Sequence, residues 1–419
     1  MKHEAIAAPG PEQAGVRSGF WKDSLRDYGL LFSLLVIMGF FYFLTDGISL
    51  APLNVTNLIL QNSYVVIMAL GMLLIIVGGN IDLSVGSTVG FVGAIAATLM
   101  VGFHLQFLGL DADIKVPWEP VILIALALGA AIGAAQGYFV AFSKIPSFIV
   151  TLGGMLIFRG LTGNMLLGQF VGPFPKSFQN ISSGFIPDFG DFDALKPLVG
   201  DSNFHWGSML VGIVGAAVLI YASVRRWSRS RAQAMDTEPF VLFIGKNAIF
   251  ALLILFFSYQ LASYKGLPEV LIIMGVLILI YAFVTTRMTI GRRIYALGGN
   301  KLAAQLSGIR TERLTFLTFV NMGLLAGLAG LIVAARLNSA TPSAGQSFEL
   351  DVIAACFIGG ASASGGVGKV MGVVIGAFVM GVMNNGMSIY GLGIYWQMVV
   401  KGIVLLSAVY VDVYQKSKG

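Results

Sequence analysis

The stretch GGNIDLSVGS, Gly78–Ser87, is a polar, glycine-punctuated interruption between two long apolar runs. Residues 63–77 before it and 88–103 after it are almost wholly apolar, so the interruption lies within reach of a membrane. Backbone groups freed there cannot face lipid, because an unsatisfied polar group in hydrocarbon costs roughly 2–7 kcal/mol. We therefore expect a helix break that lines protein or water, although an ordinary tight turn capped by Asn and Asp fits the same letters.

The composition predicts the class of protein. Hydrophobic residues make up 57% of the 419 residues and charged residues 11%, against roughly 25% charged in a soluble domain. The sequence thus predicts an all-α polytopic membrane bundle, in which the 53 glycines let helices approach closely. The single Cys356 excludes an intrachain disulfide, and three scattered histidines indicate no metal site. We expect no catalytic site, no cofactor and no nucleic-acid partner.

Apolar runs of about 17 to 25 residues, the length a bilayer requires, mark the candidate spans. They lie at 28–45, 58–78, 84–103, 120–142, 147–168, 208–224, 247–263, 267–285, 314–335, 350–362, 369–389 and 394–411. The segment 350–362 is too short for an ordinary span, so we expect a broken or re-entrant helix there. The membrane domain then covers residues 28–411, between predicted tails at 1–27 and 412–419.

Lys and Arg in the connecting segments predict the orientation. With the N-terminus inside, most of the 26 basic residues fall on inner segments, and outer segments hold only Lys115, Lys176, Lys196 and Lys265. A basic C-terminal tail inside requires an even number of crossings. The short element at 350–362 must therefore change sides, and both termini are expected in the cytosol.

A second interruption, CFIGGASASGGVGK (Cys356–Lys369), again ends an apolar run with Gly-Gly and a small polar stretch. Two such breaks predict an internal repeat with a shared site near the membrane midplane, although glycine-rich loops are common enough to explain both. The loop does not fit a nucleotide-binding motif. Val370 follows Lys369 where a Ser or Thr would hold magnesium, and Ala363 stands where the first Gly should be.

The inner segment 285–313 predicts a short helix that cannot span a membrane. Asn300 can cap residues 301–307, which Gly308 ends, and Leu302 and Leu306 form an apolar edge. Such a helix suits either the groove of a partner protein or an anionic lipid surface.

Four motifs in order resemble the permease subunits of monosaccharide ATP-binding-cassette importers, the ribose, xylose and galactose group. They are GGNIDLSVGS; KIPSFIVTLGGMLIFRGLTGN (144–164); GRRIYALGGNKLAAQLSGI (291–309); and DVIAACFIGGASASGGVG (351–368) with NNGM (384–387). Residues 208–263 resemble the additional helix pair of xylose and multiple-sugar permeases, so a xylose-like member is expected.

The resemblance implies a type II-like fold of about 10–12 spans in the bacterial inner membrane. It also implies a homodimer, a cytosolic ATP-binding-cassette subunit, a periplasmic sugar-binding protein and surrounding lipid. The implied translocation path contains Asn80, Asp82, Ser84, Ser87, Arg159, Asn384 and Asn385. The implied ATPase-coupling residues are Gly291, Arg292, Arg293, Asn300, Ala303, Ala304, Gly308 and Ile309. The long outer stretch 170–206, with Asp188, Asp191, Asp193 and Asp201, departs from the family and is expected to shape the binding-protein dock.

The competing class is an ion-coupled secondary transporter, which needs intramembrane acids or histidines. Asp82 is the only acid that we place within the membrane zone, and it is better interpreted as a structural clamp than as a sugar ligand. Arg159 lies twelve residues after Ser147, about 18 Å into its span. Its partner is expected to be either Asp82 or backbone carbonyls at the helix breaks. Ala303 and Ala304 are expected on a solvated helix that enters a groove of the ATPase.

Overall fold

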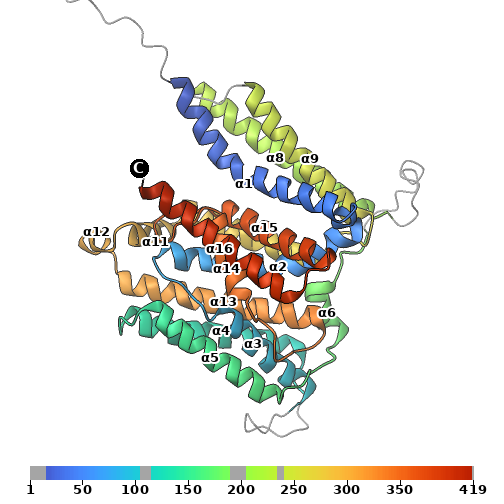
Figure 1. Cartoon of the computed structure of the whole chain (residues 1–419), viewed down its shortest axis with the longest axis vertical. Helices are drawn as coiled ribbons and strands as arrows, with labels where there is room; N and C mark the ends of the chain where they lie inside the picture. Colours follow the sequence, from blue (N-terminus) through green and yellow to red (C-terminus); the bar gives the residue numbers. More distant parts are fainter. Residues whose placement is uncertain (1–15, 104–114, 189–203, 234–239, 418–419) are drawn as a thin grey trace, which may run out of the picture.

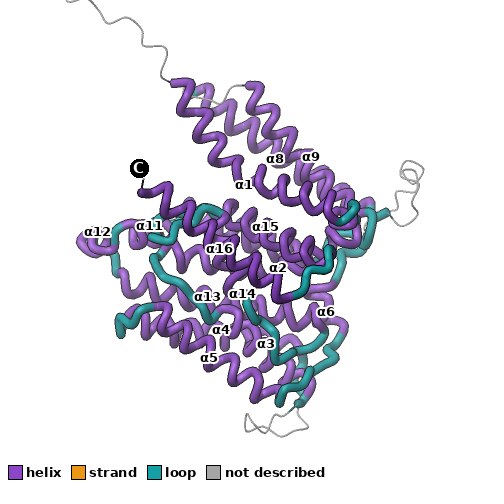
Figure 2. Tube along the Cα trace, viewed as in Figure 1, coloured by secondary structure: helices purple, strands orange, loops and turns teal. Residues whose placement is uncertain are grey.

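The computed structural model describes residues 16–103, 115–188, 204–233 and 240–417. All regular elements in these ranges are helices, and Figure 2 shows loops mainly at the two edges of the bundle. The only extended pairings in the same ranges are two isolated bridges, Val171 with Ala340 and Phe185 with Pro268. The predicted all-α class is confirmed.

Each of the predicted spans falls on a helix. The long helices are α1 (Val16–Leu44), α2 (Pro52–Val77), α3 (Val85–Val101), α4 (Trp118–Ala141), α5 (Ser147–Leu166), α8 (Trp206–Ala232), α9 (Phe240–Ala262), α10 (Glu269–Arg287), α13 (Thr311–Leu337), α15 (Val370–Ile389) and α16 (Ile394–Ser417). The shorter ones are η1 (Ile48–Leu50), α6 (Lys176–Ser183), α11 (Thr289–Gly299), α12 (Lys301–Leu306) and α14 (Phe348–Ile358). α1 begins inside the predicted N-terminal tail, at Val16 rather than at residue 28.

Within the described ranges, nine helices are long and apolar enough to cross a membrane, and α3 and the apolar part of α1 are shorter. The chain is therefore a multi-pass membrane protein. Figure 1 shows the helices in layers: α3, α4 and α5 on one side, then α13, then α2, α14, α15 and α16, and finally α1, α8 and α9. α2 is buried along almost its whole length and forms the centre of the main core.

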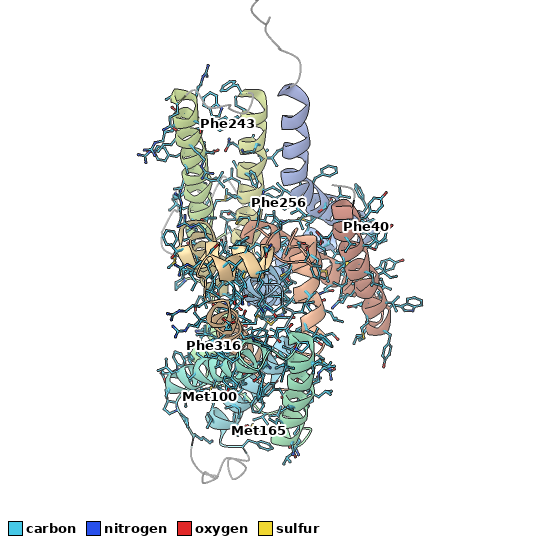
Figure 3. All side chains as sticks on the ribbon, turned by 90° about the vertical axis from the view of Figure 1, so that its left-hand side faces the viewer. Phe40, Met100, Met165, Phe243, Phe256 and Phe316 are labelled. Atoms are coloured by element: carbon cyan, nitrogen blue, oxygen red, sulfur yellow. The ribbon has the colours of Figure 1, made fainter. Side chains whose placement is uncertain are left out.

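Glycines set the close contact between α4 and α13. A Cβ added to Gly129 would lie 2.3 Å from the carbonyl oxygen of Gly323, and one added to Gly133 would lie 2.2 Å from that of Phe319. Because lipid supplies no hydrophobic force between helices, such small residues allow the backbone contact that holds them together. The α8–α9 pair stands apart, as Phe243 and Phe256 show in Figure 3 against Met100 and Met165 in the body of the bundle.

α14 has eleven residues, so it is only about 16 Å long, and a non-helical segment, 338–347, leads into it. This segment packs on α3, where glycines make room for it. A Cβ added to Gly86 would lie 2.3 Å from the carbonyl oxygen of Gly345, and one added to Gly90 would lie 2.5 Å from that of Ala344. Gly86 within the motif Gly78–Ser87 and Gly90 after it therefore make room for the chain that enters α14, and the expected broken helix is confirmed.

The two glycine breaks have the same backbone geometry. After α2, the amides of Gly79 and Asn80 donate to the carbonyls three and five residues before them, and after α14 those of Gly360 and Ala361 do the same. Gly79 and Gly360 both have positive φ, 80° and 82°, as a Schellman helix end requires. The same motif also ends α12 at Gly308 and α15 at Gly391, so it is a common helix end in this chain, and the internal repeat stays a prediction.

Candidate functional site

Two acids stand in the first turn of α14, Glu349 and Asp351, and both are buried. The other end of α14 leads into the second break, where the amide of Gly366 donates to the carbonyl of Val77 at the end of α2, 2.9 Å away. If the end of α2 and the second break mark one edge of the membrane, the eleven residues of α14 extend from there about halfway through a ~30 Å hydrocarbon core. The acids therefore lie near the membrane midplane, and the start of a helix favours negative charge.

Arg159 on α5 pairs with Glu349, with 3.0 Å between Nη2 and Oε1. Neither expected partner, Asp82 or a backbone carbonyl, is correct. The expectation that Asp82 is the only intramembrane acid is also wrong, because Glu349 and Asp351 are buried at the start of α14. In the sequence, Glu349 precedes the predicted span 350–362 and Asp351 is only its second residue. The sequence therefore places both acids at the edge of a span. In the structure, the non-helical segment 338–347 brings them to mid-membrane depth.

Asp351 has partners from two other helices, and we call the group Arg159, Glu349, Asp351, Asn384 and Lys401 the α14 cluster. Its Oδ2 accepts from Nζ of Lys401 on α16, 3.0 Å away, and from Nδ2 of Asn384 on α15, 3.1 Å away. Four buried polar atoms of this α14 cluster have no hydrogen-bond partner in the described part of the chain: Arg159 Nε, Glu349 Oε2, Asp351 Oδ1 and Asn384 Oδ1. One donor and three acceptors are thus buried without partners beside a partly exposed Arg159. A polar solute or water can satisfy them.

Asp82 belongs to a separate, closed network, the Asp82 cluster. Its Oδ1 accepts from the backbone amide and the hydroxyl of Ser84, at 2.8 and 2.7 Å, and Gln136 Nε2 on α4 donates to the Ser84 hydroxyl, at 2.8 Å. Ser87 donates to the carbonyl of Ser84, 2.7 Å away. These contacts fix the turn into α3, which agrees with the clamp role expected for Asp82.

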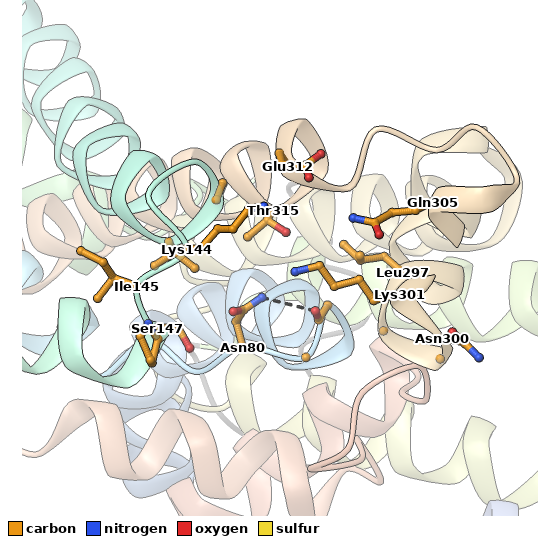
Figure 4. A pocket seen from close by; sticks show the side chains of 17 residues that line it. Asn80, Lys144, Ile145, Ser147, Leu297, Asn300, Lys301, Gln305, Glu312 and Thr315 are labelled. Carbon is orange, nitrogen blue, oxygen red and sulfur yellow. Dashed lines mark hydrogen bonds between the residues drawn. The ribbon is translucent and has the colours of Figure 1, made fainter. Parts of the chain in front are cut away.

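The remaining predicted path residues lie elsewhere. Asn385 forms a reciprocal amide pair with Asn54 at the start of α2, at 2.8 and 3.1 Å. Asn80 lines a cavity of about 440 Å³ between the end of α2, the α4–α5 connection and α11–α12. Figure 4 shows the Lys301 side chain extending from α12 toward Asn80. Of the predicted path residues, the structure thus brings only Arg159 and Asn384 to the α14 cluster.

The predicted coupling segment forms α11 and α12. The Asn300 side chain accepts from the amide of Ala303, 2.9 Å away, and Gly308 ends the turn with φ +78°, both as expected. The Tyr295 hydroxyl donates to the carbonyl of Gly368 in the second break, 2.7 Å away. Burial raises the pKa of Tyr295 above its ordinary value, so the hydroxyl keeps its proton and remains a donor.

The exposed face of α12 differs in one respect from the expectation. Ala304 is buried against its own chain, whereas Leu302 and Leu306 are 66% and 82% exposed. Ala303, Arg292 and Arg293 are also exposed, and Gly291 is buried where a Cβ would meet the carbonyl oxygen of Val284. Ile309 is partly buried. The surface open to a partner is therefore the leucine edge, and Ala304 is not part of it.

Comparison with known proteins identifies the family. A family profile described as "Branched-chain amino acid transport system / permease component" matches residues 54–409. The chain belongs to this family. It is 39% identical to the xylose transport system permease protein XylH of Haemophilus influenzae, over 94% of this chain and 98% of that protein. No solved structure gives a significant match.

Two other relatives of this permease family are similar over nearly their full lengths. The xylose permease XylH of Escherichia coli K12 is 37% identical over 95% of this chain and 94% of its own. The ribose import permease RbsC of the same strain is 33% identical over 94% of this chain and 96% of its own. The resemblance seen in the four motifs is thus confirmed at the level of the family.

Proposed function

We propose that this chain is the membrane-spanning permease of an ATP-driven importer of a monosaccharide, and that xylose is the first sugar to test. The names of the relatives support the sugar class. The observation that carries the proposal is the α14 cluster, where a helix begins near mid-membrane with unpaired donors and acceptors. Transporters commonly bind their solutes at such interrupted helices.

Arg159 and Lys401 define the face along which the sugar moves in this proposal. The Arg159 side chain is 37% exposed and Lys401 15% exposed, although a charge facing lipid at this depth costs about 2.5–3.5 kcal/mol or more. A second copy of the chain covering α5 and α16 would place these groups in an aqueous seam. Sugar hydroxyls can then exchange with water at the cluster, where each hydrogen bond contributes about 0.5–1.5 kcal/mol net.

The energy source in this proposal is a separate cytosolic ATPase that docks on the leucine edge of α12. Displacement of α12 would be transmitted to the path through α11. The Tyr295 hydroxyl of α11 donates to the carbonyl of Gly368 in the second break, and Gly298 lies against the carbonyl of Val77. A periplasmic binding protein delivers the sugar on the opposite side. The chain then lies in the bacterial inner membrane with both termini in the cytosol, as the basic inner segments indicate.

The test is uptake of radiolabelled xylose, ribose and galactose by proteoliposomes that contain the permease, its ATPase and the binding protein. Uptake should require ATP inside and stop with an ATPase variant that cannot hydrolyse ATP. A second candidate, an ion-coupled transporter, is favoured by the buried acids Glu349 and Asp351. Uptake that persists without ATPase and collapses with a protonophore would establish that alternative.

The docking edge has its own test. Leu306→Glu places a charge on the more exposed of the two leucines of α12 and should lower co-purification of the ATPase at least tenfold. Ser307→Glu adds the same charge one residue along, at an exposed polar side chain, and should leave the complex intact. Equal loss with both variants would show that general charge, and not the leucine edge, controls docking.

A further inference from the structure

A second, larger groove lies between the α8–α9 pair and the start of α15. Its volume is about 570 Å³, and its walls include Arg226 and Trp227 on α8, Lys246 and Asn247 on α9, and Met371 on α15. The walls therefore combine two cations with aromatic and aliphatic surface. Neither the family assignment nor the proposed sugar path uses this groove.

The groove lies at one surface of the bilayer. Arg226 is twenty residues after Trp206, where α8 begins, so it stands about 30 Å along the helix, the thickness of the hydrocarbon core. Met371 is the second residue of α15 and follows Gly368, whose carbonyl bonds Tyr295 of α11. The groove thus opens at the membrane surface that carries α11 and α12.

The aromatic wall is ordered by its own contacts. The Trp227 ring stacks on Phe243 with centroids 5.2 Å apart and planes 26° apart, and the Arg231 guanidinium lies 5.2 Å from the Trp227 centroid. Amphipathic rings are typical of the interface between headgroups and acyl chains. The wall therefore suits a molecule whose acyl part lies toward the bilayer interior and whose polar head lies toward the membrane surface.

Asn247 adds a polar group that is nine-tenths buried at the groove. Its Nδ2 donates to the carbonyl of Phe243, 2.7 Å away, and its Oδ1 has no hydrogen-bond partner within the described ranges. An amide oxygen can only accept, so its missing partner must be a donor such as a hydroxyl. Arg226 and Lys246, in contrast, can only donate, which suits phosphate oxygens.

We propose that this groove binds the headgroup of an anionic phospholipid of the phosphatidylglycerol type, taken from the leaflet on the α11–α12 side. The phosphate lies between Arg226 and Lys246, a headgroup hydroxyl donates to Asn247 Oδ1, and the acyl chains run along the aromatic wall. Basic pockets between helices are a known way of binding anionic lipid. The bound lipid fills the space that separates the α8–α9 pair from α15.

The experiment measures retained lipid by native mass spectrometry of the full-length permease, delipidated in detergent and titrated with phosphatidylglycerol. Arg226→Gln and Lys246→Gln should each weaken binding roughly fivefold, because each basic residue at a membrane surface contributes about 1 kcal/mol. Arg225→Gln is the matched control, since it removes the same charge from the same turn but lies outside the groove. Arg226→Lys keeps the charge and should retain binding.

Three outcomes would overturn the proposal. Equal weakening by Arg225→Gln and Arg226→Gln would indicate diffuse attraction to the basic α8 end. Equal retention of phosphatidylcholine would indicate an apolar crevice without headgroup selection, and displacement by millimolar inorganic phosphate would indicate a free-phosphate site.

Asn247→Leu tests the headgroup itself. It should abolish the preference for phosphatidylglycerol over phosphatidic acid, which has no headgroup hydroxyl beyond its phosphate, and should leave phosphatidic acid binding unchanged. An unchanged preference would overturn the assignment of the hydroxyl. Matching thermal unfolding midpoints of the lipid-free variants establish that the comparison is between folded proteins.

Discussion

The Asp82 cluster and the α14 cluster both bury carboxylates among apolar helices, but they treat the charge in opposite ways. Asp82 bonds only the amide and hydroxyl of Ser84 among the described residues, and the network closes through Gln136. In the α14 cluster, each acid faces a cation 3.0 Å away, and several polar atoms stay unpaired. A closed network holds a turn in place, whereas an open, charged one can exchange partners.

Gly86 is the point where the two regions meet. It follows the Asp82 turn on α3, and a Cβ added there would lie 2.3 Å from Gly345 O and 2.4 Å from Glu349 Oε2. The turn that Asp82 fixes therefore sets where the re-entrant chain and its acid can lie. We interpret the motif Gly78–Ser87 as the structural support of the proposed translocation path and the α14 cluster as the path itself.

The largest expected effect comes from breaking one ion pair of the α14 cluster. Glu349→Gln leaves Arg159 near mid-membrane without an anion. Removing one partner of a buried pair costs about 3–5 kcal/mol; because Arg159 is 37% exposed, we expect the lower end, about 3 kcal/mol. The measurement is the yield of monodisperse protein in detergent, together with sugar uptake.

The double variant Arg159→Gln with Glu349→Gln is the control for that pair. It should recover most of the folded yield, because it leaves no isolated charge, while uptake stays low if the cluster lines the path. Losses that simply add in the double-mutant cycle would show that the two side chains do not interact. Full uptake by a folded double variant would remove the cluster from the path.

The contrast between the clusters also explains how far the sequence predicted the structure. Polar letters inside an apolar run reveal Asp82, because a break in hydropathy is local. Glu349 and Asp351 stand at the boundary of a short span, and their depth depends on the non-helical segment 338–347 folding into the bundle over Gly86 and Gly90. That is a long-range packing event, and hydropathy along the chain carries no signal for it.

The same reasoning applies to the coupling helix and to Asn385. The bounds and cap of α12 follow from local letters, Asn300 and Gly308, and were predicted. Which face of α12 is free depends on the packing of Ala304 against its own chain, and the pairing of Asn385 with Asn54 joins residues far apart in sequence. Adjacent asparagines gave no indication that one belongs to the α14 cluster and the other to the start of α2.

Gly86→Ala tests the steric contact between the Asp82 turn on α3 and the segment that enters α14. The added methyl group meets the Gly345 carbonyl, which is backbone and moves little, and the Glu349 carboxylate; overpacking of this kind costs about 1–3 kcal/mol. Gly153→Ala is the control, because no atom lies within 4 Å of its added Cβ on α5. Thermal unfolding in detergent should show a lower midpoint for Gly86→Ala only, and equal midpoints would contradict the contact with Gly345.

Asp82→Asn tests the observation that no cation of the described residues pairs with this carboxylate. The amide oxygen still accepts from Ser84, so only the charge-assisted part of two hydrogen bonds is lost, about 1–2 kcal/mol. Asp351→Asn should cost more, since it leaves Lys401 without its anion. An unfolding midpoint lower for Asp82→Asn than for Asp351→Asn would reverse the assignment of clamp and path.

The smallest expected effect concerns the Schellman turns at the two glycine breaks, one directly before Asp82 and one at the end of α14 opposite the α14 cluster. Gly79 and Gly360 have φ of 80° and 82°, and neither has an atom within 4 Å of an added Cβ. An Ala at either position therefore meets no steric neighbour and changes only the conformational terms. The left-handed conformation costs about 1–2 kcal/mol for a non-glycine residue, and restriction of the unfolded chain offsets about 0.4–1 kcal/mol of it. Both Gly79→Ala and Gly360→Ala should thus lose about 0.5–1 kcal/mol, and Asn at either position should lose less, because Asn tolerates this conformation. Equal shifts of the unfolding midpoint would show that the two turns are under the same conformational constraint. A markedly larger loss at Gly79 would show that the turn before Asp82 bears a constraint that its counterpart after α14 does not.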